Sequence, residues 1–202
     1  MTAAVMTPSA TARYSTVAIL LHWLIAALLI GNIGLAWYFN TLPKPDQVEP
    51  LGLHKSIGIT VLLLSVIRLI WRFVAKPPPL PAYVHAWERW LSATVQVIFY
   101  VLMIGLPLSG WATVSASPLI RLHPITLYNL VPWPAIGPLT HLDSDQMHQA
   151  HRLALTTHEL LVKLAYATIV LHVAGALKHQ FISRDDVVWR MFPILRRRRS
   201  GH

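Results

Sequence analysis

Four stretches of almost uninterrupted apolar residues dominate the pattern of hydrophobic and polar positions along this chain. They cover residues 17–38, 53–74, 90–115 and 153–177. A helix needs about 20 apolar residues to cross the hydrocarbon core of a bilayer, and each stretch reaches that length. The sequence therefore predicts an all-α fold, an integral membrane four-helix bundle in which every helix spans the bilayer.

The connections between these stretches are short, except for one. The long connection covers residues 116–152 and is rich in proline, so we expect irregular structure there. Pro107 and Gly110 predict a kink in the third helix. The first stretch is too long for the apolar region of a cleaved signal peptide, which makes cleavage the weaker interpretation. No repeat or soluble domain is visible, and we predict a single membrane domain over residues 1–202.

The composition supports a membrane protein and excludes several redox centres. The 202 residues are 54% hydrophobic and only 12% charged, whereas a soluble domain usually carries about twice that charged fraction. The chain has no cysteine. Disulfides, iron–sulfur clusters, thiolate ligation of haem and covalent attachment of c-type haem are therefore all excluded.

The net charge of +9 is distributed unevenly between the two predicted membrane faces. Of the 17 lysines and arginines, twelve fall on the side of the termini and the 76–89 connection, four on the other side, and Lys163 within a helix. The positive-inside rule then places both termini in the cytoplasm. The basic tail within residues 184–202 is interpreted as a topology and lipid-surface signal rather than a nucleic-acid site.

Four histidines lie at matching depths within this predicted topology. His158 and His172 are fourteen residues apart on the fourth stretch, so they share one face and lie about 21 Å apart along the axis. His22 lies near the inner end of the first stretch, at the depth of His172. His54 begins the second stretch at the outer face, at the depth of His158.

Ionisable residues within a membrane are costly, and they usually face the bundle interior and serve a function. Each histidine taken alone is compatible with a buried ring bonded to a backbone carbonyl or a serine. Four histidines that pair by depth on three helices instead favour two bis-histidine haems stacked across the membrane. A non-redox metal-binding membrane protein that uses the same histidines is a further alternative.

Small residues follow His54 along its own face of the second helix. Gly58, Val61 and Ser65 would leave space for a macrocycle beside the helix, and Arg68 lies fourteen residues from His54 near the inner side. Arg68 would either pair with a haem propionate or extend to the membrane surface as a topology signal, and the sequence leaves both open.

The remaining histidines are expected to be solvated. His85 lies in a cytoplasmic connection and His202 ends the chain. The outer loop holds a further group with two aspartates, namely His123, His141, His148, His151, Asp143 and Asp145. Imidazole and carboxylate groups suit zinc or copper, but the spacing is loose, and we favour a polar loop over a metal site.

An ordered set of short segments carries a resemblance to a known family. These are YSTVAILLHW with His22, LGLHKSIG with His54, RLIWR with Arg68, GLPLSGW, THELLVKLAYATIVLHVAGALKH with His158 and His172, and the ending WRMFP. From Tyr14 to Pro193 the chain resembles the prokaryotic cytochrome b-561 family of di-haem, four-helix membrane proteins. The chain differs from that family in its longer 116–152 loop and its arginine-rich tail.

The resemblance implies the chemistry as well as the fold. It implies that His22, His54, His158 and His172 are axial ligands of two haem b groups, and that His179 lies near the inner haem. It further implies oxidation of superoxide, or of another periplasmic redox partner, with reduction of ubiquinone in the bacterial inner membrane.

Three cations near the outer haem, Lys55, Lys163 and Arg152, are expected to attract an anion such as superoxide. For Lys163 we favour an ion pair with Glu159, four residues before it, over this attraction, and for Lys55 the sequence leaves both open. The alternative function is a haem-bearing membrane subunit that passes electrons from a dehydrogenase or hydrogenase to quinone.

Overall fold

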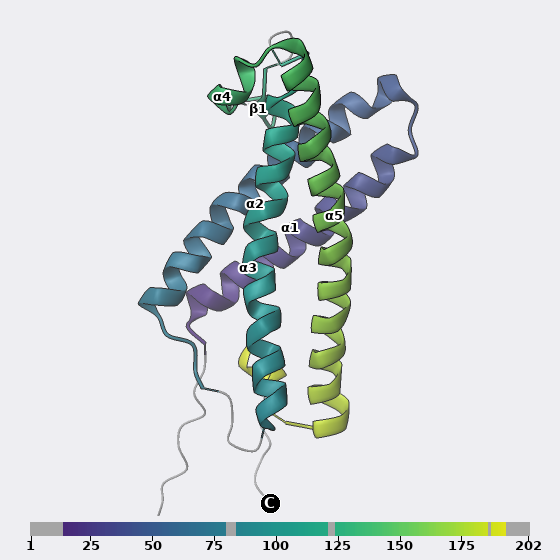
Figure 1. Cartoon of the computed structure of the whole chain (residues 1–202). Helices are drawn as coiled ribbons and strands as arrows, with labels where there is room; N and C mark the ends of the chain where they lie inside the picture. The colour runs from purple at the N-terminus through teal and green to yellow at the C-terminus, as the bar shows by residue number, and fades with distance from the viewer. Residues whose placement is uncertain (1–13, 80–83, 121–123, 186, 193–202) are drawn as a thin grey trace, which may run out of the picture.

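The computed structural model describes residues 14–79, 84–120, 124–185 and 187–192. Four helices are long and apolar enough to cross a membrane: α1 (Thr16–Asn40), α2 (Val48–Val74, preceded by the 3₁₀ turn η1, Lys44–Gln47), α3 (Ala86–Ser115) and α5 (Ser144–Leu177) (Figure 1). The predicted four-helix membrane bundle is confirmed. His123, His202 and the tail beyond residue 192 lie outside the described residues.

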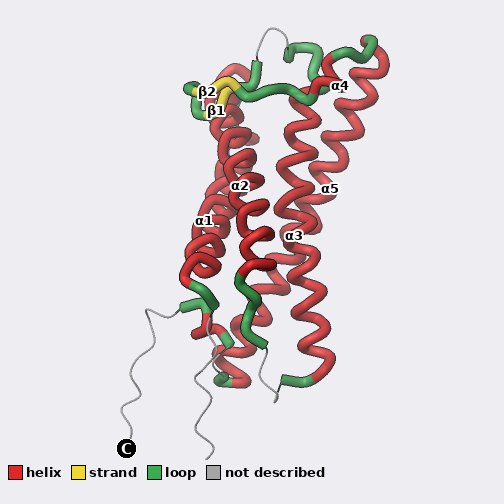
Figure 2. Tube along the Cα trace, turned by 90° about the vertical axis from the view of Figure 1, so that its left-hand side faces the viewer, coloured by secondary structure: helices red, strands yellow, loops and turns green. Residues whose placement is uncertain are grey.

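The bundle consists of two helix pairs that pack against each other. Helix α1 packs on α2, α3 packs on α5, and α2 joins the pairs by packing on α3 (Figures 1 and 2). Helices α1 and α5 meet through side chains, since the Trp37 Nε1–H donates to the Tyr166 hydroxyl at 3.0 Å. Helix α5 also contacts the α1–α2 pair through histidines: His172 lies beside His22 of α1, and His158 lies beside His54 of α2.

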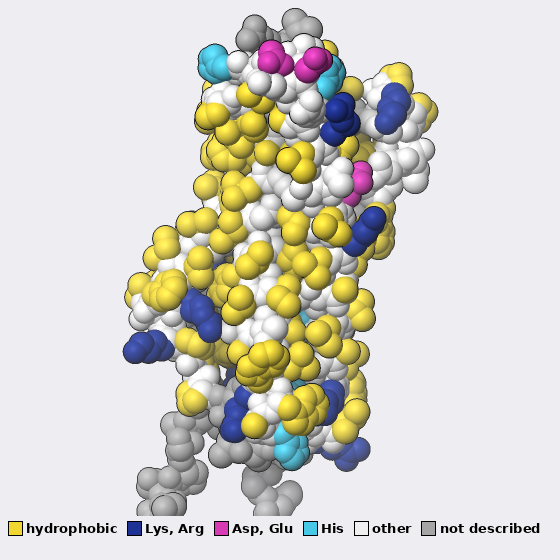
Figure 3. Space-filling model, viewed as in Figure 1, with side chains coloured by type: hydrophobic (Ala, Val, Ile, Leu, Met, Phe, Trp, Pro, Cys, Tyr) yellow, Lys and Arg dark blue, Asp and Glu magenta, His cyan; other side chains and the backbone are white. Residues whose placement is uncertain are grey.

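Small residues allow the close helix packing, while large apolar residues face outward. Ser56, Ser65 and Ala165 are almost completely buried, whereas many large apolar side chains on each of the four helices are exposed. Figure 3 shows these hydrophobic side chains over much of the length of the bundle. Close packing through small residues and an apolar outer surface are typical of helices in lipid.

The two ends of the described chain lie at the same end of the bundle. The Trp23 Nε1–H near the start of α1 donates to the carbonyl of Met191 at 2.9 Å, and its ring packs on Phe192 with centroids 4.2 Å apart. Met191 follows the short turn η3 (Val188–Arg190). Four membrane crossings return the chain to the side on which it began, and we call this the inner end.

The helices extend beyond the predicted apolar stretches, most of all α5. This helix begins at Ser144 rather than near residue 153, because the Asp143 carboxylate caps it by accepting the backbone N–H of Gln146 at 2.8 Å. The first turns of α5 are polar, so hydropathy alone does not detect them. Helix α3 continues through Pro107 as far as Ser115.

The connection between α3 and α5 is more regular than expected. It forms a small antiparallel hairpin of β1 (Thr126–Leu127) and β2 (Val131–Pro132), followed by the short helix α4 (Gly137–Thr140). The turn residues Tyr128 and Asn129 have left-handed φ values of 52° and 56°, as a tight hairpin turn requires.

This hairpin is attached to the outer part of α2. The Ser56 hydroxyl accepts the backbone N–H of Tyr128 at 2.8 Å, and the Tyr128 hydroxyl lies 2.7 Å from the Thr60 hydroxyl. The prediction of irregular structure was therefore wrong for the hairpin and for α4, and part of the connection covers α2 close to His54.

Candidate haem-binding site

The outer histidine pair joins α2 to α5. The ring centroids of His54 and His158 are 6.4 Å apart. Nδ1 of His54 lies 3.3 Å from the carbonyl oxygen of Asn32, and Nδ1 of His158 lies 3.0 Å from that of Leu106. A carbonyl oxygen only accepts hydrogen bonds, so Nδ1 carries the hydrogen in both rings. The lone pair of each Nε2 is therefore available to a metal ion. In metal sites the hydrogen bond from the other ring nitrogen usually fixes the tautomer and the orientation of the ligating histidine.

Helix α3 holds the His158 ring from one side. The Ser109 hydroxyl donates to the carbonyl of Leu106 at 2.8 Å and accepts the His158 Nδ1–H at 3.0 Å. A Cβ atom on Gly110 would lie 3.3 Å from Cε1 and 3.4 Å from Nδ1 of this ring. Glycine at position 110 thus permits a close approach of helix and ring that a larger residue would disturb.

The inner pair joins α1 to α5. The ring centroids of His22 and His172 are 6.2 Å apart. The Trp23 ring packs against His22 at 5.1 Å, and the Phe99 ring packs against His172 at 5.2 Å. The guanidinium of Arg68 interacts electrostatically with both histidine rings.

Both pairs have the dimensions of two imidazoles on opposite sides of one metal ion. A metal–imidazole bond is about 2 Å long and the ring centroid lies about 1 Å behind the nitrogen, so the two centroids should be about 6 Å apart. The observed separations are 6.2 and 6.4 Å. Three of the rings are half-buried and His172 is exposed, unlike histidines enclosed in a packed core. The nitrogen-only donor set and these distances fit a six-coordinate haem at each pair.

Almost the whole chain matches a known protein family. A family model described as prokaryotic cytochrome b561 matches residues 13–193. The chain belongs to this family. It is a membrane electron-transfer protein that binds haem b, a multi-pass protein of a bacterial membrane.

Individual relatives match this cytochrome along most of their length. "Cytochrome b561 homolog 2" of Escherichia coli K12 is 30% identical over 182 residues, which cover 89% of this chain and 90% of that protein. "Probable superoxide oxidase CybB" of Yersinia pestis is 27% identical over 186 residues, covering 90% and 96%. "Cytochrome b561 homolog 1" of Escherichia coli K12 is 26% identical over 186 residues, covering 90% and 97%.

A third histidine of α5 continues the face of the paired histidines. His151 lies within the helix, seven residues before His158, and its Nδ1 lies 2.9 Å from the carbonyl oxygen of Thr113. The contact of His158 with Leu106 is thus repeated by His151 and Thr113, seven residues earlier on α5 and seven residues later on α3. The prediction that Asp145, His148 and His151 belong to a polar loop was wrong, because all three lie in α5. For His151, the seven-residue spacing from His158 was the signal that could have placed it.

The other outer histidines do not assemble a metal site in the part of the chain that the structure describes. His141 and His148 are exposed, and no group of three or more histidine, aspartate or glutamate residues among the described positions could hold a metal ion.

The face of α2 beyond His54 differs from the expectation of open space. A Cβ on Gly58 would lie 4.0 Å from the side-chain nitrogen of Asn32, so this glycine faces an amide. Val61 and Ser65 are 3% and 0% exposed, and they pack against neighbouring helices instead of leaving space. The side-chain oxygen of Asn32 is buried without a hydrogen-bond partner. Asn32 thus contacts His54 through its backbone carbonyl, with its side-chain amide facing Gly58, a role that sequence reasoning missed.

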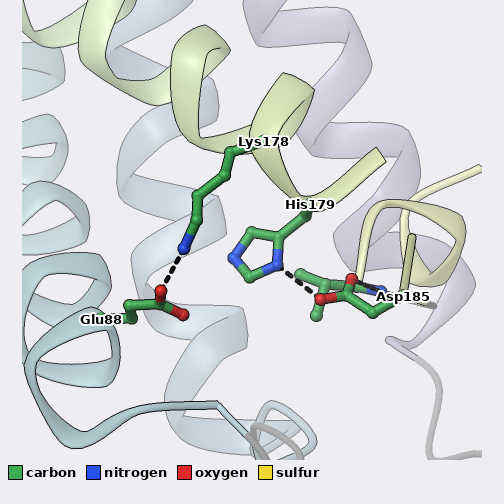
Figure 4. Close-up of polar contacts among 5 residues, drawn as sticks. Glu88, Lys178, His179 and Asp185 are labelled. Atoms are coloured by element: carbon green, nitrogen blue, oxygen red, sulfur yellow. Dashed lines mark hydrogen bonds and ion pairs between the residues drawn. The ribbon is translucent and has the colours of Figure 1, made fainter. Parts of the chain in front are cut away.

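The inner end of α5 continues as a π-helical turn, η2 (Lys178–Ser183), which carries His179. Nδ1 of His179 lies 2.7 Å from Oδ2 of Asp185, and Lys178 forms an ion pair with Glu88 (Figure 4). Among the described residues, Lys178 with Glu88 is the one ion pair between fixed charges, and His179 with Asp185 becomes an ion pair only when the imidazole is protonated. Glu159 and Lys163 accordingly do not form the expected pair, which leaves Lys163 exposed on the surface of α5.

Proposed function

We propose that this cytochrome oxidises superoxide at the outer face of the bacterial inner membrane and reduces ubiquinone within that membrane. His54 with His158 and His22 with His172 would hold two haem b groups, and Arg68 would hold a propionate of the inner one. When bound, each haem supplies a one-electron iron couple. The observation that carries the proposal is the matched distance between ring centroids in the two histidine pairs, 6.4 and 6.2 Å. The α5 members of these pairs lie about 21 Å apart along the helix.

The overall reaction places different demands on the two ends of the bundle. Two superoxide ions each lose one electron and become two molecules of dioxygen, with no proton required. Ubiquinone gains two electrons and two protons and becomes ubiquinol. The outer end therefore needs to attract a small anion, while the quinone site needs a proton donor.

Cations at the outer end fit the first demand. Lys55 follows His54 directly and acts on its ring electrostatically, and Lys163 and Arg152 are exposed on the same half of α5. Positive charges beside a low-dielectric wall raise the encounter rate of an anion, and salt weakens the effect. The name of the Yersinia pestis relative supports superoxide as the donor.

Residues at the inner end fit the second demand. His179 follows His172 by seven residues at the inner end of α5, and its Nδ1 lies 2.7 Å from Oδ2 of Asp185. A histidine exchanges protons in the physiological pH range more readily than any other ordinary side chain. We assign the quinone site to the neighbourhood of His179, with both chain ends in the cytoplasm.

Stopped-flow spectroscopy tests the proposal directly. Oxidised protein is mixed with superoxide, haem reduction is followed in the visible spectrum, and ubiquinone-1 is then added. We expect rapid reduction by superoxide and reoxidation by the quinone. If superoxide reduces neither haem while ubiquinol does, the proposed donor is wrong, and the protein is instead a membrane subunit that exchanges electrons with a partner dehydrogenase or hydrogenase.

A further inference from the structure

A histidine–carboxylate pair closes the inner end of α5. Nδ1 of His179 lies 2.7 Å from Oδ2 of Asp185, and the two side chains are only 19% and 8% exposed. The second carboxylate oxygen, Oδ1, accepts the backbone N–H of Val187 at 3.1 Å. Both oxygens of Asp185 are thus acceptors, which holds the carboxylate in one orientation.

The backbone is shaped to bring these two residues together. Helix α5 widens into the π-helical turn η2, and Arg184 then adopts a left-handed conformation with φ 50° and ψ 41°. This reversal returns the chain onto η2, where the backbone N–H of Asp185 donates to the carbonyl of His179 at 3.2 Å. A left-handed conformation is unfavourable for a non-glycine residue, and such backbone strain is found preferentially at functional sites.

The neighbouring charged residues, Glu88 and Lys178, pair with each other. Glu88 at the start of α3 forms an ion pair with Lys178, whose ammonium also lies 5.3 Å from the centre of the Trp87 ring. Figure 4 shows that His179 lies between this pair and Asp185, with its dashed contact directed to Asp185. Asp185, and not Glu88, is therefore the acid that orients the imidazole.

We propose that Asp185 is a positioning residue that prepares His179 to protonate ubiquinone; this inference rests on the proposed function. The carboxylate only accepts, so Nδ1 keeps its hydrogen and proton exchange is confined to Nε2. Nε2–H of the protonated ring transfers its proton to a quinone oxygen as the quinone takes up electrons released from superoxide. The ring is left neutral with Nδ1–H intact, and Nε2 regains a proton from cytoplasmic water before the second transfer.

The variant Asp185→Asn keeps the shape of the side chain but removes its negative charge and one of its two acceptor oxygens. Asparagine has one acceptor oxygen, which cannot serve both the Val187 N–H and the His179 Nδ1–H. We expect the oxygen to remain with the Val187 N–H, which is only two residues away in the chain. The amide NH₂ then faces Nδ1 and favours the opposite tautomer, with the hydrogen on Nε2. Asp185→Glu retains the carboxylate, and Glu88→Gln is the matched control because it removes the other acid of this region.

The kinetic experiment uses holoprotein reduced chemically, so that superoxide is not involved. We expect Asp185→Asn to slow reoxidation by ubiquinone-1 at least about tenfold and to leave reoxidation by ferricyanide, which takes up no proton, unchanged. Asp185→Glu should restore part of the rate, and Glu88→Gln should behave as wild type. Equal slowing with both oxidants would show structural damage and overturn the assignment, as would a wild-type rate with ubiquinone in Asp185→Asn.

Nitrogen-15 NMR of histidine-labelled protein provides a readout that does not depend on turnover. The His179 signal, assigned with His179→Gln, should show Nδ1 protonated in wild type and the hydrogen moved to Nε2 in Asp185→Asn. An unchanged tautomer would contradict the positioning role. Failure of wild-type protein to react with ubiquinone at all would refute the proposed function instead, so the two failures are distinguishable.

Discussion

Replacing Gly110 with alanine should weaken the haem that we assign to the outer histidine pair. The new Cβ would lie 3.3 Å from Cε1 and 3.4 Å from Nδ1 of His158, closer than the roughly 3.5–4.0 Å of a favourable carbon contact. The ring cannot yield freely, because Nδ1 is held at 3.0 Å by both the Leu106 carbonyl and the Ser109 hydroxyl. It must move by a few tenths of an ångström, which strains those two hydrogen bonds and displaces the Nε2 that would bind the haem iron.

The expected size follows from the behaviour of residues that orient metal ligands. Disturbing such a contact typically lowers metal affinity about 10- to 100-fold, which corresponds to about 1.4–2.7 kcal/mol. Haem content and the visible spectrum of purified Gly110→Ala protein measure the effect. We expect the low-spin signal of one haem to be reduced or converted to high-spin, and the other to be retained.

Gly105→Ala on the same helix is the matched control, because its Cβ would meet the Leu161 side chain at an ordinary 3.5 Å. That variant should keep both haems. Retention of two unperturbed haems in Gly110→Ala would refute the reasoning, and loss of both haems in Gly105→Ala would show that α3 tolerates no added methyl group.

Two further changes test the assignment of the ligands and of the outer entrance. His158→Ala should remove mainly the outer haem and His172→Ala mainly the inner one, as judged from redox titration; a six-coordinate inner haem in His172→Ala together with its loss in His179→Ala would mean that the inner ligand was chosen wrongly. Raising ionic strength should slow reduction by superoxide and spare reoxidation by ubiquinone, since only the first step attracts a soluble anion to Lys55, Lys163 and Arg152; a superoxide rate that ignores salt would contradict the steering argument.

The membrane helices and the pairing of the histidines were predictable from the sequence because both depend on simple periodicity. Apolar length defines a membrane span, and a separation of fourteen residues places His158 and His172 on one face. The same regularity extends to His151, but the polar start of α5 hid that histidine within an assumed loop. Hydropathy detects where a helix meets lipid, whereas the Asp143 cap determines where the helix begins.

Contacts between helices were not predictable in the same way. The close approach of Gly110 to His158 and the buried amide of Asn32 depend on the packing of α3 and α1, which no pattern along one segment encodes. Val61 and Ser65 lie on the same face of α2 as His54, yet they are buried against neighbouring helices. A small side chain can permit close helix packing as well as leave space for a ligand, and the sequence does not distinguish the two. The contact between His179 and the Asp185 carboxylate depends on the left-handed conformation of Arg184. Arginine rarely adopts this conformation, so the sequence does not predict it.

The number of haems bound by each chain tests the central claim most directly. A pyridine haemochrome assay on purified protein, combined with an accurate protein concentration, gives this ratio, and the visible spectrum gives the spin state. The two histidine pairs predict two b-type haems per chain, both six-coordinate and low-spin. A ratio of one, or a protein without haem, would contradict the account.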